Sequence, residues 1–201
     1  MTKNKKILKN FWIKFYSILF SLLICQYAFA DQNLSASKRV SKFMSIINQY
    51  IDSDSNMVRS KKATALKSYV DLEFMAKATT GKYWKKTTIL QKEKFRKELF
   101  NKFFNFINIH VEDLKEIKFV EKSVKARGPK LIYIDGEIDT KKFKKVRVTW
   151  KLSAKTLKIL DIDIEKISLI KSQRLEVKEL LRKHRGDFSK FMSLYFNDKI
   201  K

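Results

Sequence analysis

Apolar side chains recur at helical spacing through the middle of the chain. A row of four residues is widened by three more into a broad stripe: Phe95, Leu99, Phe103, Phe106, Phe100, Phe104 and Ile107. Thr88 can cap the first free amides of this helix, and Gln91 stands three residues later, as in a capping box. The pattern predicts a long helix beginning after Thr88, with a stripe wide enough to need covering on two sides.

Further helices are predicted on both sides of this one. Residues 34–51 form an amphipathic segment whose apolar stripe is Val40, Phe43, Met44, Ile47, Tyr50 and Ile51. The polar run 52–56 breaks it, and residues 61–79 read as one or two short helices that end before Gly81. Near the C-terminus, helices are expected over 172–184 and 187–196, separated by Gly186.

From Ile117 the hydrophobic period changes from helical to two. Alternation is clearest over 146–152 and 160–164, with further strands expected over 131–138 and 117–124. These segments predict a four-stranded antiparallel meander with one buried face. The expected fold is therefore α+β, a single domain over residues 31–201 in which the N- and C-terminal helices pack on one face of the sheet. A pocket can lie between the layers, although an aromatic stripe of this kind is more often plain core.

The first thirty residues have the pattern of a secretory signal peptide. Five lysines and no acid precede an apolar run over 15–25, and Ala28-Phe29-Ala30 provides a small-x-small cleavage site. A transmembrane anchor and a lipoprotein acylated at Cys25 are the alternatives. The apolar run is shorter than the roughly 20 residues of a spanning helix, and Ile24 is large for lipoprotein processing. We expect cleavage after Ala30, export to the periplasm, and a mature chain without cysteine or disulfide.

Positive charge dominates the composition. The formal net charge is +24, from 37 Lys and 8 Arg against 21 acidic residues. Nucleic acid is the usual first inference from such a charge. Export argues against it, as does the preference for Lys over the Arg that favours bidentate phosphate recognition. Two explanations stay open: a merely solvated surface, or attraction to anionic membranes and acidic partner proteins.

Few residues suggest catalysis or metal binding. The two histidines, His110 and His184, have no cysteine partner, and no phosphate-cradling glycine loop is present. Asp161 and Asp163 share one strand face, which would suit a carboxylate pair or a cation site. Solvent-facing alternation explains both more simply. We expect neither an enzyme nor a cofactor or metal.

Two groups of residues resemble the signature of a known family. The first is Asp71, Phe74, Met75 and Ala76, followed by Gly81, Tyr83 and Trp84 and by Gln91, Phe95 and Phe100; the second is Ser168, Leu169, Ile170 and Arg174. Together they resemble the MlaC family, also called toluene-tolerance proteins, over about residues 38–196. Members usually carry a glycine shortly before the serine, where this chain has Glu165-Lys166-Ile167, and a tryptophan where it has Leu157.

The resemblance implies a monomeric periplasmic carrier whose cargo, rather than cofactor, is phospholipid. Its partners would be an outer-membrane lipoprotein complex and an inner-membrane ABC transporter with a lipid-binding ring, a system that maintains outer-membrane lipid asymmetry, and it would bind no nucleic acid. Exposing some thirty methylenes at about 0.8 kcal/mol each would cost tens of kcal/mol, so both tails would need a deep, dry slot. A basic periplasmic adaptor that carries no lipid is the alternative.

Candidate lining residues come from the signature, the central helix and the sheet. They are Phe74, Met75, Ala78, Tyr83, Trp84, Phe95, Leu99, Phe103, Phe106, Val148, Trp150 and Leu169. Arg174 is the candidate for a charge at the mouth or for a structural ion pair. Ordinary core packing is the competing explanation for each of them.

Overall fold

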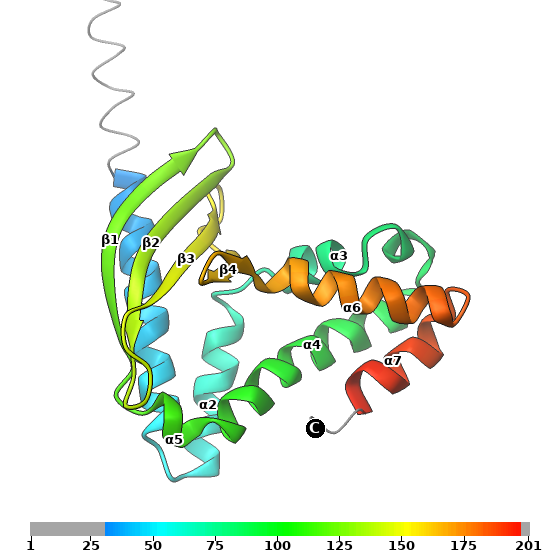
Figure 1. The fold of residues 1–201 in the computed structure, drawn as a ribbon, viewed down its shortest axis with the longest axis horizontal. Coiled ribbons are helices and arrows are strands. Elements are labelled where there is room, and N and C mark those ends of the chain that lie inside the picture. Colours follow the sequence, from blue (N-terminus) through cyan, green and yellow to red (C-terminus); the bar gives the residue numbers. More distant parts are fainter. Residues whose placement is uncertain (1–30, 198–201) are drawn as a thin grey trace, which may run out of the picture.

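The computed structural model describes residues 31–197 (Figure 1). The predicted signal peptide, residues 1–30, lies outside the described residues. Helix covers residues 31–51, in agreement with the predicted amphipathic segment. Two short helices follow, α2 (Asn56–Lys67) and α3 (Leu72–Thr80). Between them the chain is tied to a strand, because the Asp71 amide donates to the Ile159 carbonyl and the Ile159 amide donates to the Tyr69 carbonyl.

The predicted central helix begins where its capping signal stands. The Thr88 hydroxyl accepts from the Gln91 amide at 3.2 Å, and the Gln91 side chain accepts from the Thr88 amide at 2.9 Å. Before this capping box, Gly81 ends α3 with a φ of 58°, a conformation that glycine adopts without strain. The turn η1 (Gly81–Lys86) then leads into α4 (Ile89–Ile109), and α5 (Val111–Leu114) follows.

The sheet is an antiparallel meander, as predicted, but it has one strand more. Within residues 31–197 its order is β1-β2-β3-β4-β5: β1 (Lys118–Arg127), β2 (Leu131–Asp139), β3 (Val146–Ser153), β4 (Ile159–Ile164) and β5 (Ile167–Ser168). The four-strand prediction was wrong because β5 has only two residues, too few for alternation to show. It forms because Glu165 and Lys166 make a two-residue turn with φ of 48° and 67°, which pairs Ile164 with Ile167.

The last two helices are α6 (Leu169–Lys183) and α7 (Phe188–Asn197). The first begins three residues before the predicted start at Ser172. The reason is Ser168, whose hydroxyl accepts from the Lys171 amide at 3.0 Å and so caps the helix directly after β5.

The apolar core is divided into two clusters, which we call the sheet cluster and the helical cluster. In the sheet cluster the helix of residues 31–51 packs on the sheet with Leu66 and the end of α4. In the helical cluster α3, η1, the first half of α4, α6 and α7 pack together. Figure 1 shows α6 running away from β4 and α4 crossing from one end of the molecule to the other. The prediction that both the N- and C-terminal helices pack on one face of the sheet is thus corrected, because the C-terminal helices bury their apolar stripes against α3 and α4.

None of the helices within residues 31–197 has the length and apolar character needed to cross a membrane.

Candidate functional site

An apolar cavity of about 90 Å³ lies at the junction of the two clusters. It is bounded by the helix of residues 31–51, α2, α3, α4, β4 and α6. Its lining is Phe43, Leu66, Val70, Leu72, Met75, Leu99, Phe100, Phe103, Asp161, Ile162, Leu169, Ile170 and Gln173. Eleven of these thirteen side chains are apolar, so the cavity suits a hydrocarbon better than a polar ligand.

The cavity walls belong to both clusters. Met75, on α3, packs against the sheet cluster and the helical cluster alike. On the sheet side, Phe43 is buried and lies edge-on to Trp150, with ring centroids 5.6 Å apart. On the other side, Leu99 belongs to the helical cluster and is 7% exposed. A movement of one cluster relative to the other would therefore change the size of this cavity directly.

One edge of the cavity carries a charged network. The Asp161 carboxylate, in a residue only 8% exposed, accepts from the Ser168 hydroxyl at 2.7 Å and from the Ile170 amide at 3.2 Å. Lys151 Nζ lies 3.0 Å from Asp161 and 2.5 Å from Asp163. Burial by itself lowers the pKa of Lys151, but its hydrogen bonds to the two carboxylates outweigh burial and leave that pKa raised.

The network corrects the expectation that Asp161 faces solvent. Strand alternation places Asp161 and Asp163 on one face, and the beginning of α6 then covers Asp161. The sequence signal that could have revealed this is Ser168, a helix-capping serine seven residues beyond the aspartate. The two aspartates are held by a lysine, which leaves no open carboxylate pair for acid–base chemistry. No cluster of three or more metal-ligating side chains occurs within residues 31–197.

Four of the residues proposed from sequence line the cavity: Met75, Leu99, Phe103 and Leu169. They come from α3, α4 and the start of α6, which the chain brings together around one space. Sequence reasoning missed Phe43, Leu66 and Val70 among the lining residues, although their apolar positions were visible. Nothing local distinguishes a side chain that borders a cavity from one that fills a core.

The other candidates lie elsewhere. Trp84 and Phe95 fill the helical cluster, whereas Val148 and Trp150 fill the sheet cluster. The remaining five are partly or fully exposed and do not line the cavity: Phe74, Ala78, Tyr83, Phe106 and Arg174. Whether any of these residues contacts a lipid stays a prediction.

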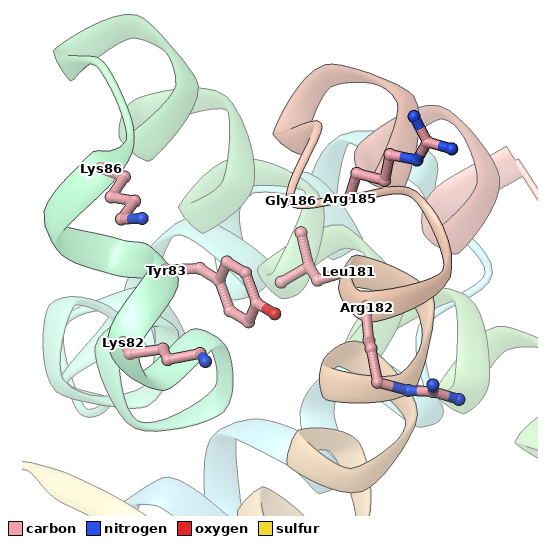
Figure 2. A pocket seen from close by; sticks show the side chains of 7 residues that line it. All are labelled: Lys82, Tyr83, Lys86, Leu181, Arg182, Arg185 and Gly186. Carbon is pink, nitrogen blue, oxygen red and sulfur yellow. The ribbon is translucent and has the colours of Figure 1, made fainter.

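Three of those five have clear surroundings. Phe106 is 52% exposed and stacks on His110, with ring centroids 4.6 Å apart. Arg174 is exposed and its guanidinium covers the end of α3, because a Cβ added to Gly81 would lie 3.3 Å from Arg174 Nη2. Tyr83 borders a separate basic hollow between η1 and α6 (Figure 2).

Comparisons with known proteins gave one matching family and a similar solved fold. No curated protein has a sequence that matches this chain. Among solved structures, the phospholipid-binding protein from Ralstonia solanacearum, in complex with a phospholipid at 1.53 Å resolution, has a similar fold, with a TM-score of 0.67. The two are 13% identical, and the match covers 81% of this chain and 95% of that chain. The family model described as MlaC protein matches residues 35–194. The chain therefore belongs to the MlaC protein family.

Proposed function

We propose that this protein is a periplasmic phospholipid carrier that holds acyl tails in the cavity between its sheet and helical clusters. The observation that carries the proposal is the cavity's apolar lining at a junction that both clusters share. The similar fold of a phospholipid-binding protein that was solved with a phospholipid supports it. Residues 1–30 would serve as the export signal and be removed after Ala30.

Carriage requires the cavity to enlarge. A volume of about 90 Å³ corresponds to about three water molecules, far less than two acyl chains occupy. Enlarging the cavity by moving one whole cluster away from the other costs less free energy than disrupting either core, since each cluster then keeps its own internal packing. Met75, which packs against both clusters, provides contacts that would change.

The carrier would act as a monomer without catalysing a reaction. It would pass lipid between an outer-membrane lipoprotein complex and an inner-membrane ABC transporter with a lipid-binding ring, with energy supplied by the transporter. The head group would remain at the mouth of the cavity, where water can solvate it. The tails account for most of the binding free energy, because burial of each methylene contributes about 0.8 kcal/mol.

Native mass spectrometry of residues 31–201, purified from the periplasm without detergent, tests the proposal. We expect a stoichiometric adduct with the mass of a phospholipid. Leu169→Glu should abolish it, because Leu169 lines the cavity yet is 38% exposed at the first turn of α6, where an acid is tolerated. Leu175→Glu is the matched control on the same helix, since Leu175 is 71% exposed and does not line the cavity.

Lipid extraction then identifies the adduct. A clean protein mass, with no lipid taken up from labelled vesicles, would overturn the carrier proposal and favour an adaptor that carries nothing. Equal lipid loss in both variants would show that this cavity is not the site of lipid binding, because only Leu169→Glu alters its lining.

A further inference from the structure

Two basic segments meet at the end of the helical cluster that lies away from the sheet. We call residues 82–92 and 182–190 together the distal tip; they comprise η1, the start of α4 and the α6–α7 turn (Figure 1). The Gln91 side chain donates to the Ser189 hydroxyl at 3.1 Å, which joins the start of α4 to the start of α7. Gly186 lies against Tyr83, since a Cβ added there would be 3.4 Å from the ring.

The distal tip is strongly positive. Residues 82–92 contain four lysines and no acid, and residues 182–190 contain four cations and one acid, Asp187. The Asp187 carboxylate already accepts from the Lys190 amide at 3.0 Å. Lys82, Lys86, Arg182 and Arg185 are exposed, and none of them makes an ion pair with any residue in the described range 31–197. Their charges are therefore available to an external anion.

A hollow of about 310 Å³ opens between these cations. Figure 2 shows the Lys82 and Lys86 side chains extending toward it from η1, with the Tyr83 ring and Leu181 between the two elements. On the other side, the guanidinium groups of Arg182, on α6, and of Arg185, in the α6–α7 turn, extend away from the hollow. Two ammonium groups beside a tyrosine ring would suit an anionic group.

An exposed apolar pair stands three and four residues after Lys86, which lines the hollow. Ile89 and Leu90, at the first turn of α4, are 75% and 77% exposed, the two highest values among large apolar side chains in residues 31–197. In the sequence they follow Lys85 and Lys86 after two intervening threonines, Thr87 and Thr88. Protruding apolar residues flanked by lysines are typical of segments that lie in the membrane–water interface.

We infer that the distal tip docks on the surface of an anionic phospholipid bilayer, with lipid phosphates at the hollow and Ile89 and Leu90 among the head groups. Charge complementarity favours a bilayer, because exposed lysines act as point charges that need no fixed partner geometry. The tip is not the mouth of the apolar cavity, since Leu181 lies about 12 Å along α6 from Gln173, the nearest cavity residue on this helix. Docking therefore goes beyond lipid carriage and does not depend on it.

Vesicle co-sedimentation of residues 31–201 tests the inference. We expect binding to vesicles of phosphatidylcholine mixed with phosphatidylglycerol, and little binding to phosphatidylcholine alone. Lys82→Gln/Lys86→Gln should weaken that binding about 30-fold. Ile89→Gln/Leu90→Gln should weaken it while preserving the protein's charge. Raising the salt from about 0.1 M to about 1 M should abolish it, because the Debye length shortens from about 10 Å to about 3 Å.

Matched controls separate the tip from overall charge and exposure. Lys125→Gln/Lys130→Gln removes the same charge at the β1–β2 end of the sheet, and Met57→Gln removes a 65% exposed apolar side chain on α2. Both controls should bind vesicles like the wild type. Circular dichroism and thermal unfolding verify that every variant is folded.

Three results would overturn the inference: no binding of wild type to anionic vesicles, unchanged binding by both tip variants, or equal loss in the control lysine pair. Retention on an immobilised acidic peptide through Lys82 and Lys86, without vesicle binding, would instead identify an acidic protein as the partner. Native mass spectrometry of the tip variants keeps this question apart from carriage, because they should retain any lipid adduct.

Discussion

The Ser168 hydroxyl serves two elements at once. It donates to the Asp161 carboxylate at 2.7 Å and accepts from the Lys171 amide at 3.0 Å, so it links β4 to the first turn of α6. The same carboxylate accepts from the Ile170 amide. Because Leu169 and Ile170 line the apolar cavity, this link fixes the position of one cavity wall relative to the sheet.

Asp161→Ala should therefore cost about 3 kcal/mol of unfolding free energy, because it leaves buried donors without their acceptor. Asp163→Ala is the control. This change also removes a carboxylate from Lys151, but the Asp163 side chain makes no bond to α6. We therefore expect a cost of about 1 kcal/mol of unfolding free energy. Urea unfolding measures both values. Equal costs would show that the link to α6 contributes nothing beyond the lysine pair.

The β4–β5 turn should become more stable with a glycine. Lys166 has a φ of 67°, in the left-handed region that strains a side chain. Lys166→Gly should raise the unfolding free energy by about 0.5 to 1 kcal/mol. Lys155→Gly, in the β3–β4 turn at a residue without a positive φ, should lower it. Stabilisation by both or neither in urea unfolding would contradict the strain argument.

Gly136 should not tolerate a methyl group. A Cβ there would lie 2.4 Å from Phe119 Cε2 and 2.5 Å from the Val120 carbonyl oxygen. Gly136→Ala should therefore cost about 2 to 3 kcal/mol, because Phe119 also packs edge-on to Trp150 and cannot move freely.

Gly128→Ala is the comparison for this change. Nothing lies within 4 Å of a Cβ at Gly128, so only its φ of 65° opposes the change, at about 1 kcal/mol. Thermal unfolding of the two variants distinguishes steric from backbone effects, and a larger loss at Gly128 would argue against close packing at Gly136.

Tyr195 should make stability fall at alkaline pH. Burial, with a smaller contribution from Glu176, raises the pKa of its phenol in the folded protein. As the pH rises, the unfolded chain therefore loses this proton before the folded protein does. Above about pH 10, the contribution of Tyr195 to the unfolding free energy declines by about 1.4 kcal/mol per pH unit. Below that pH the group binds one proton in both states and contributes no slope.

Tyr195→Phe tests this dependence. The buried hydroxyl has no hydrogen-bond partner within residues 31–197, so its removal should cost little near neutral pH. Urea unfolding at about pH 9 and about pH 11 should show a smaller decline for the variant than for the wild type. The same decline in both proteins would assign the alkaline effect to other groups.

Local sequence determined most of the elements, although not the two-residue strand β5, and it indicated the family. Thr88 and Gln91 cap α4 through contacts three residues apart, and strand alternation reflects the backbone's own period, so neither depends on distant packing. The signature around Gly81, Tyr83 and Trp84 led to the family whose model matches residues 35–194.

Only the tertiary structure decided how those elements share their apolar surfaces. Phe95 and Phe104 lie on the same helical stripe, yet one packs in the helical cluster and the other in the sheet cluster. The cavity exists where these clusters meet, and Asp161 is buried because α6 begins over it. Periodicity specifies which face of an element is buried, but the partner of that face depends on contacts between residues far apart in the chain.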